Sequence, residues 1–250
     1  MRKANSYLDL VLNPFNLFRT KRILNINPTV IPQRKEPESI NLYVYDYDAE
    51  NIHEERLKNV KDCFTYKHSN RVTWINVDGL RRSDVEVICN HYGIHPLVQE
   101  DILSIGQRPK VDEIEGVMFC LLNMLYFNEK ESAVEVEQIS IVLGEQFVLS
   151  FQEDASRDVF NPLRDKIQFR QNKIRQSGTD YLFYTLIDLI VDSYFVVMER
   201  LSDKIETLEE DIVRNPNKRT LARINQLRKE MIVLKRNIAP VRDMVNGILR

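Results

Sequence analysis

Two adjacent acidic residues, Glu100 and Asp101, follow the tripeptide His-Pro-Leu at positions 95–97. Hard divalent cations such as Mg²⁺ prefer carboxylate oxygens and usually keep several of their water ligands. Carboxylates that face a neighbouring subunit could therefore hold such an ion between two copies of the chain. The residues taken alone favour the plainer interpretation, which is a solvated helix face.

A second pair of acids, Asp188 and Asp192, lies four residues apart within an apolar stretch. Residues at this spacing share one face of a helix. An acid in so apolar a segment is costly unless it is paired or lies at a surface. From the residues alone, we expect a salt bridge to an Arg or Lys of a neighbouring helix.

A third group of acids stands near the end of the same predicted helix, shortly before Asn215-Pro216. Its members are Asp203, Glu206, Glu209, Glu210 and Asp211. Their combined field attracts cations, but they do not make a specific ligand set. A solvated helix end is the favoured interpretation of this group.

The residue types that serve enzymatic chemistry lack the necessary arrangement. His91 and His95 have a spacing that can bind zinc on a helix, but Gly93 and Pro96 indicate a helix break and no HExxH pattern is present. We expect both histidines to cap and pack. No Walker loop, GxGxxG or Gly-x-Ser-x-Gly motif occurs. The protein is therefore predicted not to be an enzyme.

Composition narrows the remaining classes of protein. The 250 residues are 43% hydrophobic and 29% charged, with a net charge of -2, so no basic field would recruit nucleic acid. Cys63, Cys89 and Cys120 form no CxxC pair and are expected to be buried free thiols. The most apolar run, 181–198, contains Asp188 and Asp192, so the chain itself is predicted to be soluble.

The elements that must position these acids begin with two predicted segments. Residues 1–38 are punctuated by prolines and predict an irregular N-terminal arm. Residues 39–153 predict an α/β domain, of the α+β type, in which helices flank a mixed sheet of about five strands. Its strands are expected at 40–47, 72–77, 111–127, 134–143 and 147–151. Its helices are expected at 51–61, from an N-cap at Ser83 to about Gly93, and from His95-Pro96 to about Ser104.

Two further segments, 154–216 and 217–250, have a helical period. We expect a helix over 162–175, a second helix that Thr179 caps and that runs to Val213, a turn at 215–217, and a last helix over 220–250. Apolar residues recur every three or four positions along both long helices, which predicts a coiled-coil-like seam and an antiparallel helical hairpin. The seam residues are Phe195, Met198, Leu201, Ile205, Leu208 and Ile212 in the first helix, and Leu221, Ile224, Leu227, Met231, Leu234, Ile238, Val241, Val245 and Ile248 in the second.

The block at 91–112 resembles a known family. His95-Pro96-Leu97, then Glu100-Asp101-Ile102-Leu103, then Arg108-Pro109-Lys110-Val111, follow the order typical of the cytoplasmic, N-terminal domain of CorA-type magnesium/cobalt transporters. The resemblance extends from about residue 40 to residue 250 and includes 72–77, 138–143, 147–153 and 191–195. Each piece alone is weak, but the ordered set is hard to obtain by chance.

This resemblance implies a cytoplasmic sensor and gating domain of a Mg²⁺/Co²⁺ channel-like transporter, homopentameric when intact, at the inner face of a bacterial inner membrane. It implies a regulatory Mg²⁺ between subunits at Asp101 and Glu100, with Asp192 nearby. It also implies weak cation attraction at Glu206, Glu209, Glu210 and Asp211. The partner acid would come from a stalk helix beyond Arg250, so this chain would hold half of the site.

Because the apolar rhythm continues to the last residue, we expect the chain to be truncated before the stalk and the two transmembrane helices. The Gly-Met-Asn signature of the family does not occur in it. Two alternatives stay open. One is a zinc-transporting relative with the same fold, and the other is a soluble helical-hairpin scaffold protein.

Overall fold

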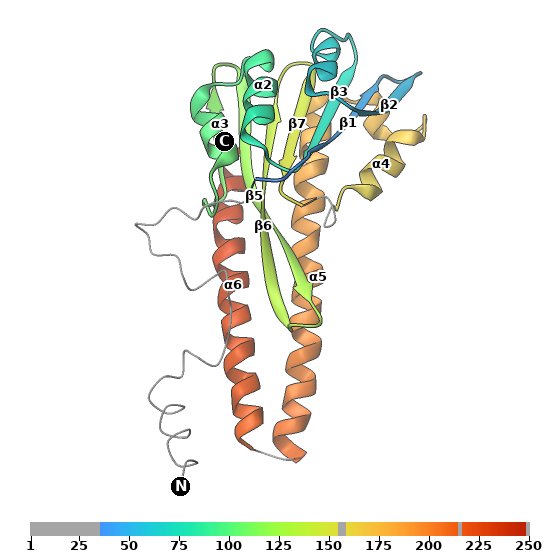
Figure 1. The fold of residues 1–250 in the computed structure, drawn as a ribbon. Coiled ribbons are helices and arrows are strands. Elements are labelled where there is room, and N and C mark those ends of the chain that lie inside the picture. Colours follow the sequence, from blue (N-terminus) through green and yellow to red (C-terminus); the bar gives the residue numbers. More distant parts are fainter. Residues whose placement is uncertain (1–35, 155–158, 215–216, 249–250) are drawn as a thin grey trace. The chain divides into compact units, whose positions relative to one another are not determined.

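The computed structural model describes residues 36–154, 159–214 and 217–248. Its centre is a mixed seven-stranded sheet with the order β2-β1-β3-β7-β6-β5-β4, in which β3 and β7 pair in parallel and every other pair is antiparallel (Figure 1). The strands are β1 (Asn41–Tyr47), β2 (Ile52–Leu57), β3 (Val72–Asp78), β4 (Lys110–Ile114), β5 (Val117–Asn128), β6 (Ala133–Leu143) and β7 (Phe147–Gln152). The predicted mixed sheet followed by a helical hairpin is confirmed.

Different helices cover the two faces of the sheet. One face buries side chains of α2 (Arg82–Tyr92), α3 (Pro96–Leu103) and the 3-10 helix η2 (Val60–Tyr66). The other face packs against α4 (Asn161–Gln168), η4 (Lys173–Gln176), α5 (Thr179–Arg214) and α6 (Lys218–Ile248). We call the sheet together with α2, α3 and η2 the head, and we call α5 and α6 together the hairpin.

Trp74 shows why the sheet is stable between these layers. Its side chain is fully buried, stacks on Tyr45 with ring centroids 4.9 Å apart, and meets the edge of Phe160. The indole Nε1 donates to Ser150 Oγ at 2.9 Å, so the polar end of the ring keeps a partner in the interior.

Sequence patterning was wrong at two edges of the sheet. Residues 51–61 were expected to be a helix, but they form β2 and the start of η2. Most of β2 is exposed, so its sequence has no apolar alternation, and pairing with β1 determines its conformation. The strand expected over 111–127 is two strands, because Glu115 and Gly116 both have positive φ and turn the chain into a β4–β5 hairpin.

Three predicted helix boundaries also differ. Helix α2 begins at Arg82 with Arg81 as its N-cap, and Ser83 lies inside its first turn. The helix expected over 162–175 ends at Gln168 and is followed by η4. Thr179 begins α5, but its hydroxyl donates to the carbonyl of Glu145 instead of capping the helix. Residues 1–35 of the arm expected at 1–38, and residues 215–216 of the turn expected at 215–217, lie outside the described residues.

The two helices of the hairpin run side by side away from the sheet (Figure 1). Leu201, Leu208, Leu234 and Val241 of the predicted seam are buried. Other predicted seam residues are exposed in the described protomer, namely Phe195, Ile212, Leu221, Ile224, Met231 and Val245. The seam is therefore only half closed, since one helix pair cannot bury apolar stripes of this width on both sides.

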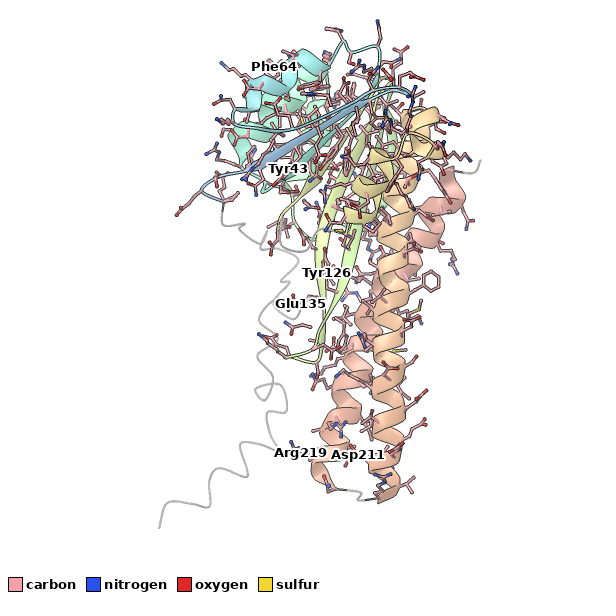
Figure 2. All side chains as sticks on the ribbon, turned by 90° about the vertical axis from the view of Figure 1, so that its right-hand side faces the viewer. Tyr43, Phe64, Tyr126, Glu135, Asp211 and Arg219 are labelled. Atoms are coloured by element: carbon pink, nitrogen blue, oxygen red, sulfur yellow. The ribbon has the colours of Figure 1, made fainter. Side chains whose placement is uncertain are left out.

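The distal part of β5 and β6, residues 124–137, extends along the hairpin. Figure 2 places Tyr126 and Glu135, which pair across this extension, between the labelled residues of the head and those at the far end of the hairpin. Val134 donates its backbone N–H to Glu230 Oε2 at 2.7 Å, and the Tyr194 hydroxyl donates to the carbonyl of Asn123 at 2.6 Å. These bonds attach β6 to α6 and β5 to α5.

Among the described residues, one helix is long and apolar enough to cross a membrane by length and composition, and this helix is α5. The apolar side chains of Leu182, Leu186 and Ile190 in α5 are fully buried against the sheet. A helix that covers a sheet in the core of a soluble protein meets the same criteria of length and composition.

Candidate cation-binding cleft

Asp101 lies on α3, whose start agrees with the prediction from His95-Pro96. His95 is the N-cap, its Nδ1 accepts the backbone N–H of Leu97 at 3.1 Å, and Pro96 occupies the first turn. Val98 and Ile102 are fully buried against the sheet. Asp101 lies on another side of this short helix and is half-buried.

A cleft of about 440 Å³ separates α3 from β4. Its lining residues include four acids and one lysine. The lining residues are Leu97, Glu100, Asp101, Lys110, Asp112, Glu113 and Ile114. The donors in this cleft are carboxylate oxygens without sulfur or imidazole, which is the donor type that suits Mg²⁺.

Lys110 connects the two walls of the cleft. Its Nζ lies 2.5 Å from Asp101 Oδ2 on α3 and 3.1 Å from Asp112 Oδ2 on β4. Burial lowers the pKa of Lys110, but hydrogen bonds and charges from Asp101 and Asp112 outweigh it and raise the pKa above its ordinary value. Lys110 is therefore a permanent cation inside an acidic cleft.

Asp101 has partners on both of its carboxylate oxygens. Besides Lys110 on Oδ2, the side-chain Nε2 of Gln107 donates to Oδ1 at 2.7 Å. Gln138, which is buried on β6, donates to the carbonyls of Ser104 at 2.8 Å and Asp101 at 3.3 Å. The end of α3 is thus fastened to the central sheet, which fixes the position of the Asp101 carboxylate.

Glu100 differs from its neighbour. Its side chain is exposed, and within the described residues its carboxylate has no hydrogen bond or ion pair. A cation could therefore bind Glu100 without displacing a protein partner.

The structure does not bring Asp192 to this cleft within one protomer. Asp188 and Asp192 lie on α5, which covers the opposite face of the sheet from α3. Both side chains are exposed, and no ion pair in the described part of the chain involves either of them. The salt bridge that we expected for this pair from the residues alone is therefore absent from the described protomer.

The acidic residues at the far end of α5 are also remote from the cleft, because that end of α5 lies far from α3 in Figure 1. Asp211 is paired with Arg223 of α6, and Glu210 lies 3.4 Å from Arg214. Glu206 and Glu209 are exposed. Arginine thus neutralises part of this end, so its attraction for cations is weaker than the acids alone indicate.

The histidines and cysteines serve packing. His91 stacks on Phe64 with ring centroids 3.8 Å apart, and burial lowers its pKa. All three cysteines are buried free thiols, and burial raises the pKa of Cys63 and of Cys89 to about 12. Within the described ranges, no group of three or more His, Cys, Asp and Glu side chains is arranged to hold a metal. The described part of one protomer therefore has no preassembled metal centre of this kind.

Sequence reasoning singled out Glu100 and Asp101 but missed the opposite wall of the cleft. Lys110 and Asp112 are two residues apart, so they point to the same side of β4. That alternation was a usable signal for the two residues together. The sequence held no signal that these two residues lie close to Asp101, since that closeness depends on how α3 packs beside an edge strand.

Comparisons with known proteins agree with this fold. The family model described as CorA-like Mg²⁺ transporter protein matches residues 69–250. The cobalt/magnesium transport protein CorA of Thermotoga maritima is 37% identical over 223 residues, which are 89% of this chain and 63% of that protein. The zinc transport protein ZntB of Yersinia pseudotuberculosis is 24% identical over 177 residues, or 70% of this chain and 52% of that protein.

A solved structure shows the same fold at low sequence identity. The soluble domain of CorA from Methanocaldococcus jannaschii superposes with a TM-score of 0.63 at 18% identity, covering 87% of this chain and 81% of that one. The chain spans between about half and two thirds of the length of these two curated relatives, 52% and 63%.

Proposed function

Because this chain belongs to the family of CorA-like Mg²⁺ transporter proteins, we propose that it is the cytoplasmic sensor domain of a divalent-cation transporter. The family consists of transporters and not of enzymes. In the complete protein, the domain is proposed to sit at the inner face of a bacterial inner membrane, attached to it through transmembrane helices that follow the chain. The assembly is proposed to be a homopentamer.

The regulatory ligand is proposed to be Mg²⁺, bound between subunits at Asp101 and Glu100, with Asp192 contributed to the same interface. The observation that carries this assignment is the cleft between α3 and β4, which four acidic residues line and in which the exposed Glu100 carboxylate has no partner among the described residues. The oxygen-only donor set fits a hard cation. When bound, the ion would neutralise carboxylates that otherwise repel one another across the interface.

Gating then follows from the charge balance. With the ion in place, neighbouring subunits are held together and the gate stays closed. Without the ion, the carboxylates of adjoining subunits repel one another and release that restraint. The acids at the far end of α5, namely the exposed Glu206, Glu209 and Glu210 and the half-buried Asp211, are proposed to attract cations weakly without forming a specific site.

The test uses the full-length transporter in lipid vesicles with a range of internal Mg²⁺ concentrations. Asp101→Asn removes one charge and one ligand oxygen, and we expect the Mg²⁺ concentration for half-inhibition of ion flux to rise at least about tenfold. Asp203→Asn is the matched control, because Asp203 is an exposed acid on α5 that lies 3.8 Å from Arg200. An unchanged half-inhibition concentration in Asp101→Asn would refute the assignment of Asp101.

Zinc transport is the second candidate, because a zinc transport protein is among the relatives. The donors of the cleft argue against a zinc sensor here. The cysteines are buried, and His91 and His95 are occupied in packing and capping. Uptake of Mg²⁺ and Zn²⁺ measured in parallel in the same vesicles distinguishes the two, and saturable Zn²⁺ uptake without Mg²⁺ uptake would favour the zinc transporter.

A further inference from the structure

We propose that Lys110 is a tethered counter-ion that occupies the cation position of the cleft, so that a divalent cation binds by displacing it. This inference rests on the proposed function, and it concerns how the site is set to respond. It assigns to Lys110 the role of a competitor for the ion, in addition to any structural role.

The ammonium group occupies the side of the Asp101 carboxylate that faces β4, where a cation bound to Asp101 inside the cleft would lie. Nζ is within hydrogen-bond distance of Asp101 Oδ2 and Asp112 Oδ2, at 2.5 Å and 3.1 Å, and these two groups stand on opposite walls of the cleft. A divalent ion that bridged the same two carboxylates would overlap with Nζ. The two cations therefore exclude each other from this position.

The net charge of the lining residues favours binding of a cation that carries more charge than the Lys110 ammonium group. Glu100, Asp101, Asp112 and Glu113 give four negative charges against the one positive charge of Lys110, a balance of -3 among the lining residues. A single ammonium therefore leaves most of the acid uncompensated. The lining residues still attract cations while Lys110 is in place.

Lys110 is also able to leave. About a third of its side chain, 34%, is exposed, and its charged end sits on a flexible four-carbon stem. Asp101, in contrast, lies at the end of α3 that Gln138 fastens to β6. The acid is fixed and the base is mobile, which is the arrangement that an exchange of cations requires.

Competition of this kind weakens the affinity for the divalent ion without removing any ligand. The free energy of breaking the Lys110 ion pairs is subtracted from the free energy of binding the ion. The site then fills only when the ion is abundant. A sensor that must release its ion when the concentration falls needs such weak binding.

The test compares metal binding by full-length variants in detergent. Mn²⁺ serves as the probe, because free Mn²⁺ is counted directly by electron paramagnetic resonance, and Mg²⁺ is then added as a competitor. The sites that disappear in Asp101→Asn define the class of interest. For that class we expect Lys110→Met to bind Mn²⁺ about tenfold more tightly, which corresponds to about 1.4 kcal/mol.

Two further variants separate charge from structure. Lys110→Arg keeps the positive charge, and we expect it not to tighten binding. Lys166→Met makes the same change at an exposed lysine of α4 that has no ion pair within the described residues, and we expect no change. If Lys110→Met fails to fold, Lys110→Gln replaces it, and thermal unfolding in the absence of metal reports folding for every variant.

The outcomes distinguish this inference from the function on which it rests. If Asp101→Asn loses no Mn²⁺ sites, the proposed function is wrong at that residue. If Asp101→Asn loses sites but Lys110→Met leaves their affinity unchanged or weaker, the sensor assignment stands and Lys110 is not a competitor. Tighter binding in both Lys110→Met and Lys110→Arg would also overturn the inference, since it would not depend on charge.

Discussion

In the head, Trp74 and Ile75 are fully buried between two layers, whereas in the hairpin Phe195 and Leu221 are 58% and 59% exposed. The head has helices on both faces of its sheet, so each strand can bury side chains in both directions. The hairpin has only its two helices and the β5–β6 extension. The comparison teaches that both faces of the head's sheet are covered within one protomer, one of them partly by the hairpin, while the apolar surface of the hairpin itself is incomplete.

The largest effect is expected when a large side chain in the middle of the head is replaced by alanine. Trp74→Ala removes a fully buried indole, its stacking on Tyr45 and its hydrogen bond to Ser150. We expect the free energy of unfolding to fall by about 4 kcal/mol, as measured by urea denaturation. A loss below about 1 kcal/mol would mean that the centre of the head is not tightly packed.

Two buried carboxyl groups sharpen the comparison further, namely Glu137 at the point where the β5–β6 extension leaves the head and Glu230 in the hairpin. Glu137 in β6 accepts the backbone N–H groups of Glu153 and Asp154 on Oε1, while its Oε2 is buried without a partner in the described part of the chain. Burial is the main cause that raises the pKa of Glu137 to about 7, against an ordinary value of 4.5, although the two N–H bonds oppose it.

A raised pKa means that the folded state holds this proton more tightly than the unfolded state, so stability falls as the pH rises from about 4.5 through 7. We expect Glu137→Gln to be more stable than the natural chain by about 3 kcal/mol at pH 8 and by about 1 kcal/mol at pH 5. Denaturation at both pH values measures the difference. Glu230→Gln in the hairpin is the comparison variant, and an equal difference at both pH values for Glu137→Gln would contradict the prediction.

The smallest expected effect lies within the hairpin itself. Leu234 is buried in the seam at 5% exposure, and Leu221 on the same helix is exposed. We expect Leu234→Ala to cost about 2 kcal/mol and Leu221→Ala less than about 0.5 kcal/mol in the isolated protomer. Thermal or urea denaturation checks both variants. Equal costs would show that a neighbour covers Leu221 under the conditions of the measurement.

Several features of the fold followed from local patterns. His95-Pro96 predicted the start of α3, Gly93 predicted the end of α2, and the spacing of apolar residues predicted both long helices. These signals depend on neighbouring residues only. Local sequence could not reveal β2, because its side chains are exposed and its partner β1 determines its structure.

The candidate site was predicted only in part, because local sequence does not show which distant elements pack together. Glu100 and Asp101 stood out as adjacent acids, and the family resemblance pointed to Asp101. The ion pair between Asp101 and Lys110 was not predictable, because it joins a helix to an edge strand that the turn at Glu115-Gly116 creates. Asp192 was placed near the site by resemblance alone, and in one protomer it lies on the other side of the sheet.

Strand β6 has a mechanical consequence for the whole domain. Gln138 of this strand donates hydrogen bonds to the end of α3 beside Asp101, and Val134 of the same strand donates to Glu230 of α6. These two anchor points are four residues apart on a single extended strand, a span of about 13 Å. An extended strand resists stretching. Helix α3 and the hairpin therefore cannot shift relative to each other without straining the hydrogen bonds at Gln138 or at Val134.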